Sequence, residues 1–235
     1  MKHLILASTS TLHGEEYLEY LRPVIRHHFV PGKPVLFLPF ARPGGITHSA
    51  YTEQARLAFE RADLRLEGID QVKDPKSAIS EAGGFFVGGG NTFLLVQQLY
   101  RLDLLTPLRE AILRGVPYLG TSAGTNIAGL TMQTTNDMPI VYPPSFKTLG
   151  LVPFNINPHY LDPDPGSRHK GETRETRIAE FHVFNTPPVI GLREGSWLEV
   201  SDDQIILKGD QRARIFKAGK PPVEVQPESL LHDLR

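Results

Sequence analysis

The chain has 235 residues, of which 40% are hydrophobic and 22% charged, and its formal net charge is −1. A nearly neutral chain lacks the basic character that binding to nucleic acid or to an anionic membrane requires, so we expect neither partner. The absence of cysteine excludes disulfides, thiolate metal sites and a cysteine nucleophile. Residues 1–7 form too short an apolar run for a signal peptide, and no run approaches the roughly 20 apolar residues of a membrane-spanning helix. We therefore expect a cytoplasmic protein.

Short apolar runs alternate with longer amphipathic stretches over the first two-thirds of the chain. The runs predict buried strands at residues 4–6, 35–38, 64–66, 85–87 and 118–119, and the stretches predict helices at residues 14–28, 47–62, 75–81, 92–100 and 106–114. Asp74 followed by Pro75 is a typical start for the third of these helices. Apolar strands separated by helices indicate an α/β fold with a mostly parallel sheet covered on both faces.

Beyond residue 133 the pattern is weaker. Residues 134–171 are rich in Pro, Asn and Asp, which predicts long loops around one or two short strands, and residues 172–182 have helical periodicity. Short alternating runs over residues 189–216 predict a small antiparallel end to the fold, with a hairpin turn at 201–203. We expect the Pro-rich and charged tail from residue 217 to fray. No repeat or linker divides the chain, so we expect one domain over residues 1–235.

The segment Gly120-Thr121-Ser122-Ala123-Gly124 has the G-x-S-x-G form of a nucleophile elbow. Such an elbow is a sharp turn from a strand into a helix that exposes the serine hydroxyl, and its glycines avoid side-chain collisions. A predicted strand precedes this segment, and residues 123–128 are able to form a helix. These features favour a serine hydrolase with Ser122 as nucleophile over a simple glycine-bracketed turn.

A second glycine cluster, Gly88-Gly89-Gly90-Asn91, follows the strand predicted at residues 85–87. Glycines let backbone N–H groups approach an anion, which beside a serine nucleophile is the oxyanion of a tetrahedral intermediate. The expected donors are Gly89 or Gly90 together with Ala123. The cluster lacks the sequence patterns of a phosphate-binding loop, so nucleotide binding is the weaker interpretation.

A serine nucleophile needs a base, and His159 and His169 are the best placed of the nine histidines. His169 lies between Arg168 and Lys170, which would disfavour its protonation, so we favour His159. The carboxylate that orients this histidine is open among four candidates, Asp137, Asp162, Asp164 and Glu194. The chain order of α/β-hydrolases, in which the acid precedes the histidine, favours Asp137.

Five segments in this order resemble the peptidase E, or α-aspartyl dipeptidase, family of serine peptidases. They are VGGGNTF at 87–93, GTSAG at 120–124, TNDMPIV at 135–141, NPH at 157–159 and HKGETR at 169–174. The resemblance extends from the first strand to about residue 216. It implies a sheet of the flavodoxin-like or class I glutamine amidotransferase-like type, and a triad in the order Ser, His, Glu. Glu194 would then replace Asp137 as the residue that orients His159.

The resemblance also implies hydrolysis of dipeptides with an N-terminal aspartate, Asp-Xaa. It assigns the aspartate preference to Arg174, whose guanidinium can pair with a carboxylate. We expect Asp137 to bind the substrate ammonium group and Asn91 to contribute to substrate binding. Thr121 departs from the family, since some members have a bulky aromatic residue there.

The sequence leaves three alternative functions open. Cyanophycinase-like enzymes, which cleave aspartyl–arginine linkages, also have the GTSAG segment, and a non-catalytic binding protein could keep the glycine loops. A glutaminase-like amidotransferase usually needs a cysteine nucleophile, which this chain lacks. The chain has no paired-ligand spacing such as H-E-x-x-H, so we expect no metal ion and no cofactor. We expect a small peptide as the partner and a monomer or a homodimer as the assembly.

Overall fold

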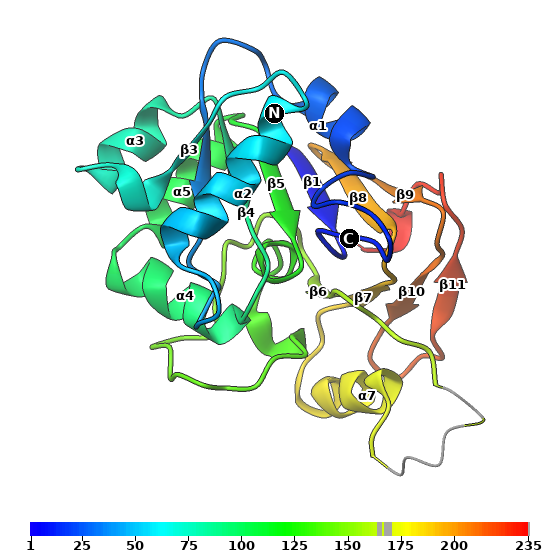
Figure 1. Cartoon of the computed structure of the whole chain (residues 1–235). Helices are drawn as coiled ribbons and strands as arrows, with labels where there is room; N and C mark the ends of the chain where they lie inside the picture. The colour runs from blue at the N-terminus through cyan, green and yellow to red at the C-terminus, as the bar shows by residue number, and fades with distance from the viewer. Residues whose placement is uncertain (164–165, 167–170, 235) are drawn as a thin grey trace.

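The computed structural model describes residues 1–163, 166 and 171–234. Its main sheet has seven strands in the order β3-β2-β4-β5-β1-β8-β9 (Figure 1). The first five are mutually parallel and span Leu66–Gly68, Val35–Leu38, Gly84–Val87, Tyr118–Thr121 and His3–Ala7. Of the last two, β8 (Ser196–Ser201) pairs antiparallel with β1, and β9 (Gln204–Gly209) pairs antiparallel with β8. Every residue of β2, β4 and β5 is buried, as expected of strands covered on both faces.

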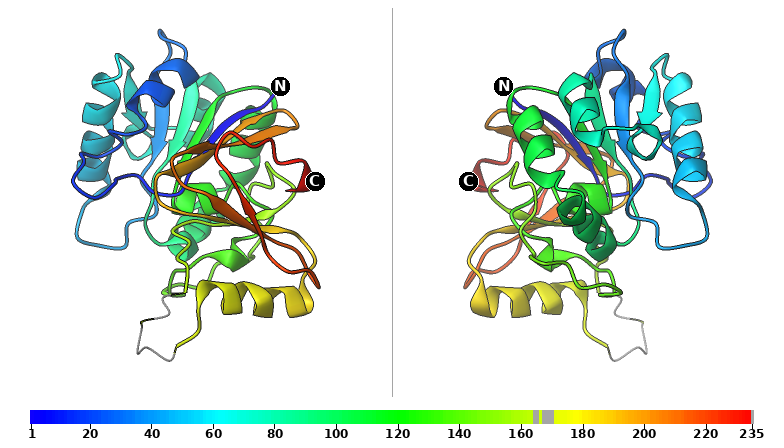
Figure 2. Two further views of the ribbon diagram at one scale, coloured as in Figure 1. Left: turned by 90° about the vertical axis from the view of Figure 1, so that its right-hand side faces the viewer. Right: turned by 90° about the vertical axis from the view of Figure 1, so that its left-hand side faces the viewer.

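Helices cover both faces of this sheet, and Figure 2 shows the two helical layers on its opposite sides. On one face lie α1 (Arg22–His28) and α2 (His48–Glu60), which pack against Phe37 and Phe86. On the other lie α3 (Pro75–Glu81), α4 (Thr92–Arg101), α5 (Leu105–Leu113) and the short α6 (Ala123–Asn126). Phe86 belongs to the first core and Val87 to the second, because neighbouring strand residues point to opposite faces. The predicted mostly parallel α/β sheet is confirmed.

A second sheet has four strands in the order β11-β10-β7-β6. These strands span Val223–Val225, Ala213–Phe216, Val189–Leu192 and Asn155–Asn157. β6 and β7 are parallel neighbours, whereas β10 pairs antiparallel with both β7 and β11. Helix α7 (Arg174–Phe184) lies beside this sheet, at the bottom of Figure 1, and its Ile178 packs against Val189 and Phe216. Short 3-10 turns at Ile69–Gln71, Met132–Thr134 and His232–Leu234 complete the elements.

Several details differ from the sequence prediction. The helix expected at 14–28 forms only over Arg22–His28, because Leu18 adopts a left-handed backbone with φ of 59° and Pro23 begins a new helix. The third strand lies at Leu66–Gly68 rather than at 64–66. The C-terminal strands do not form one antiparallel unit, since β8 and β9 extend the main sheet and β6 adds a parallel strand to the second.

The C-terminal tail is folded rather than frayed. β11 pairs with β10, and Leu231 and Leu234 are buried in the main core at 4% and 0% exposure. Burial of the two leucines and the pairing of β11 with β10 both oppose the entropy lost on ordering this Pro-rich and charged segment. Within the described residues, the helices are all too short or too polar to cross a bilayer.

Candidate active site

Ser122 stands at the turn between β5, which ends at Thr121, and α6, which begins at Ala123. Its backbone has φ of 52° and ψ of −110°, a conformation that non-glycine residues rarely adopt and that costs of order 1–3 kcal/mol. The flanking glycines are sterically required, because a Cβ on Gly120 would lie 2.6 Å from Gly124 O and one on Gly124 would lie 2.1 Å from Val87 O. The segment therefore has the geometry of the predicted elbow.

His159 lies between Ser122 and Glu194. Its Nε2 is 3.0 Å from Ser122 Oγ, and its Nδ1 is 2.6 Å from Glu194 Oε1. His159 follows the end of β6 and Glu194 follows the end of β7. Because these strands are parallel neighbours, their carboxyl ends meet, and two residues 35 positions apart become hydrogen-bonded partners. The three residues named by the resemblance thus form one continuous chain of side chains.

The other predicted partners of Ser122 lie elsewhere. The Asp137 carboxylate, favoured by the α/β-hydrolase order, accepts hydrogen bonds from Thr92 and Thr135 and none from His159. Asp162 pairs with Arg193. Asp164 and His169 lie outside the described residues.

Ser8 forms hydrogen bonds with the backbone near both His159 and Glu194. Its side chain is fully buried, and its Oγ accepts a hydrogen bond of 2.9 Å from the backbone N–H of His159 and donates one of 2.8 Å to Leu192 O. Tyr160 N also donates to Leu192 O, at 2.9 Å. These bonds join the segment that carries His159 to the strand end that carries Glu194. They also hold His159 at its left-handed φ of 52°.

The glycine loop passes close to the nucleophile. A Cβ built on Gly89 would lie 3.0 Å from Ser122 Cβ and 3.5 Å from Ser122 Oγ, so only glycine leaves space there. Gly90 has φ of 141°, and its Cβ would lie 2.3 Å from Ala41 O. Ala123 begins α6, whose first N–H groups have no partner within the helix. Gly89 and Ala123 thus lie directly beside Ser122, and the oxyanion-binding role expected of the backbone there stays a prediction.

Asp137 lies at the N-terminus of α4. Its Oδ2 accepts hydrogen bonds from Thr92 N at 2.7 Å, Thr92 Oγ1 at 2.6 Å and Thr135 Oγ1 at 3.0 Å. A small cavity of about 30 Å³ is lined by Asp137 together with Ser122 and His159. The carboxylate is thus fixed in orientation at one wall of the space in front of the nucleophile.

Asn91 uses both ends of its side-chain amide within the protein. Its Oδ1 caps α4 by accepting from Leu94 N at 3.0 Å, and its Nδ2 donates to Met138 O at 2.9 Å. These bonds tie the glycine loop to the segment that carries Asp137. The contacts support a structural role, and the substrate-binding role expected for Asn91 stays a prediction.

Arg174 is the first residue of α7, after the capping residue Thr173. Burial lowers the pKa of Arg174, the charge of Arg177 adds to this effect, and the carboxylate of Asp137 opposes it. Asp137 is therefore within electrostatic reach of Arg174. Among the residues that the structure describes, no carboxylate forms an ion pair with Arg174, so its charge is available to a ligand.

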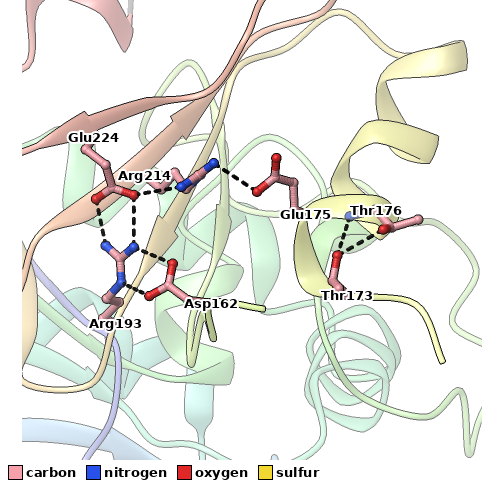
Figure 3. A network of polar contacts seen from close by, with 7 residues as sticks. All are labelled: Asp162, Thr173, Glu175, Thr176, Arg193, Arg214 and Glu224. Carbon is pink, nitrogen blue, oxygen red and sulfur yellow. Dashed lines mark hydrogen bonds and ion pairs between the residues drawn. The ribbon is translucent and has the colours of Figure 1, made fainter. Parts of the chain in front are cut away.

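An arginine–carboxylate network connects the start of α7 to the strand that carries Glu194 (Figure 3). Its members, in order of contact, are Asp162, Arg193, Glu224, Arg214 and Glu175, with N–O distances of 2.7, 2.9, 3.2 and 3.0 Å. Arg193 precedes Glu194, and Glu175 follows Arg174. The network therefore fixes the backbone next to both residues. The sequence analysis did not predict it, because its members come from five separate segments.

Comparison with known proteins identifies the family. The sequence profile of peptidase family S51 matches residues 4–208. The chain belongs to this family. S51 relatives include "Peptidase E" of Streptomyces coelicolor, 49% identical over 99% of this chain and 94% of its own length. Another, named "Probable alpha-aspartyl dipeptidase", is from Drosophila melanogaster and is 49% identical over 96% of this chain and 94% of its own length. The S51 chain is a serine peptidase.

The S51 fold is also found in a solved structure, that of a peptidase from an acI-B1 Actinobacterium. It matches with a TM-score of 0.73 over 98% of this chain and 96% of its own, at 18% sequence identity. At that identity the likeness supports the fold alone, which agrees with the predicted α/β class.

Proposed function

We propose that this S51 peptidase hydrolyses dipeptides with an N-terminal aspartate, and that Ser122, His159 and Glu194 carry out the reaction. The observation that carries the proposal is the continuous hydrogen bonding from Ser122 Oγ through the His159 ring to Glu194 Oε1. In the reactive tautomer His159 Nδ1–H donates to Glu194, so Nε2 is free to accept the Ser122 proton. The glutamate orients the ring and stabilises the imidazolium that forms.

The reaction follows in two halves. His159 takes the Ser122 proton as Oγ attacks the carbonyl carbon of the aspartyl residue, and then gives that proton to the leaving amine. Water hydrolyses the acyl-enzyme by the same proton transfers in reverse. Backbone N–H groups of Gly89 or Gly90 and of Ala123 stabilise the oxyanion, each contributing about 2.7–4 kcal/mol to lowering the barrier.

Two charges define the site for the aspartyl residue. Arg174 has no ion-pair partner in the described part of the chain, and the carboxylate of Asp137, which lines the cavity beside Ser122, raises the pKa of Arg174. Arg174 pairs with the aspartate side chain, and Asp137 pairs with the free ammonium group. Because Asp137 needs a cationic partner, the enzyme requires an unblocked N-terminus. A small peptide is then its only required partner, encountered in the cytoplasm by a monomer or a homodimer.

The test is an assay with four peptides, Asp-Leu, Glu-Leu, Leu-Asp and N-acetyl-Asp-Leu, with and without a chelator. We expect cleavage of Asp-Leu alone, independent of the chelator, and none by Ser122→Ala. Arg174→Gln should lose most of the Asp-Leu turnover. Arg26→Gln, an exposed arginine on α1, is the matched control and should retain it. Failure of the parent protein to cleave Asp-Leu, or equal rates with Glu-Leu, would contradict the proposal.

A further inference from the structure

An Asp-Xaa dipeptide carries two carboxylates and one ammonium group. The proposed function, on which this inference rests, assigns the aspartate side chain to Arg174 and the ammonium group to Asp137. The second carboxylate is the α-carboxylate of the leaving residue. A dipeptidase that recognises this group needs a further cation near the nucleophile, on the side away from Arg174.

Arg42 lies next to the glycine loop. It follows β2 by four residues, at the carboxyl edge of the main sheet where Ser122 also lies. The residue before it, Ala41, accepts a hydrogen bond of 2.7 Å from Asn91 N, and Gly90 packs directly on the Ala41 carbonyl. The backbone at Arg42 is therefore held against the loop that contacts Ser122.

The side chain of Arg42 is placed by Tyr51. The guanidinium carbon lies 4.7 Å from the centroid of the Tyr51 ring, a cation–π contact, and Tyr51 is fully buried. Tyr51 OH donates to Gly89 O at 3.2 Å, and Gly89 touches Ser122. The Tyr51 ring thus supports the guanidinium, and two residues, Tyr51 and Gly89, connect Arg42 to the nucleophile.

No carboxylate among the described residues neutralises the charge of Arg42. Within residues 1–163, 166 and 171–234, no carboxylate pairs with Arg42, and its Nε is buried without a hydrogen-bond partner. A buried donor left unpaired is costly and uncommon in native proteins, and it marks a group that a ligand can satisfy. Arg42 and Arg174 thus share one property: among the described residues, neither guanidinium has a carboxylate partner.

Asp137 and Tyr51, the residues that link Arg174 and Arg42 to the rest of the protein, lie on opposite sides of the sheet edge. Asp137 is bonded to the start of α4, which packs in one core with Val87, whereas Tyr51 belongs to α2 and to the opposite core with Phe86. A dipeptide bound across Ser122 would direct its aspartyl residue towards α4 and its leaving residue towards α2. We propose that Arg42 binds the α-carboxylate of the leaving residue and so selects dipeptides over longer or amidated substrates.

The experiment compares Asp-Leu with Asp-Leu amide, which lacks that carboxylate. We expect the parent enzyme to prefer Asp-Leu by about 10- to 100-fold in kcat/KM, the range of a charge-assisted contact. Arg42→Gln should remove this preference by raising KM for Asp-Leu alone, and Arg42→Lys should restore part of it. Arg56→Gln, an exposed arginine on α2, is the matched control and should keep the preference.

Four results would overturn the proposal. Equal losses on both substrates in Arg42→Gln would mean that Arg42 acts only by supporting the glycine loop. Tyr51→Phe tests the support of the glycine loop by itself, because this variant keeps the aromatic ring beside Arg42 and removes the hydrogen bond to Gly89 O. An unchanged preference in a folded Arg42→Gln variant would refute carboxylate binding, as would equal cleavage of both substrates by the parent enzyme, while leaving the proposed function intact. Cleavage of neither substrate by the parent enzyme would overturn the proposed function as well.

Discussion

Ser8→Ala tests how the His159–Glu194 pair is held. The substitution removes one acceptor from the His159 N–H and one donor from Leu192 O, both at buried positions. Leu192 O keeps its hydrogen bond from Tyr160 N, but the His159 N–H is left unpaired, which costs about 1–3 kcal/mol. The left-handed His159 backbone, whose strain is about another 1–3 kcal/mol, also loses a hydrogen bond that holds it in place. A shift of His159 by about 1 Å is enough to lower the rate about 100-fold.

We therefore expect Ser8→Ala to lower kcat for Asp-Leu by about 10- to 100-fold with little change in KM, because the binding groups are untouched. The assay is steady-state hydrolysis of Asp-Leu, with thermal unfolding of the same samples. Ser8→Thr keeps the hydroxyl and should recover most of the rate.

Thr148→Val is the matched control, since it also removes a buried hydroxyl that donates to a backbone carbonyl, Gly129 O at 2.7 Å. It should lower the melting temperature without lowering kcat. If Ser8→Ala melts earlier yet retains the parental kcat, Ser8 serves stability alone and the reasoning about His159 is wrong.

Three further predictions concern other parts of the molecule. Glu194→Gln should lower kcat about 10³- to 10⁴-fold with KM nearly unchanged, measured on Asp-Leu; a loss under tenfold would argue against its orienting role. Arg214→Met, which detaches Glu175 from Glu224, should raise KM for Asp-Leu more than it lowers kcat, and the reverse split would contradict a link to Arg174. Burial lowers the pKa of His28 from 6.5 to about 4, so the unfolded chain binds a proton that the folded chain excludes. The free energy of unfolding, measured with urea, should therefore fall by about 3 kcal/mol as the pH drops from 6.5 to 4, and it should fall less in His28→Gln. The same pH dependence in both proteins would refute this.

The parallel core could be predicted from the sequence because its signals are local. The apolar runs that became β2, β4 and β5 are surrounded by helical periodicity, and Asp74 with Pro75 marks the start of α3. The short strands of the second sheet have three or four residues and little alternation, so their pairing is set by packing against β7 rather than by their own composition. The fold of the tail was also mispredicted, because its charge and proline content indicate a frayed end although two of its leucines are buried.

In the candidate site too, some residues could be identified from local sequence and others only from the way distant segments pair. Ser122 could be identified from five neighbouring residues, whereas the choice between Asp137 and Glu194 depends on the parallel pairing of β6 and β7 and came only through the family resemblance. Ser8 and Arg42 were missed because their roles depend on contacts 151 and 9 positions away along the chain. One signal was available, since both follow strands of the parallel sheet, whose carboxyl ends are where such folds bind ligands.

The division of the site between two sheets has a consequence for the timing of activity. Ser122 and the glycine loop belong to the main sheet, while His159 and Glu194 project from β6 and β7 of the second. On the proposed mechanism, a growing chain that has reached residue 158 possesses its nucleophile but no base. The ability to cut peptides then arises only when β7 has paired with β6, so catalysis itself reports that the second sheet has begun to form.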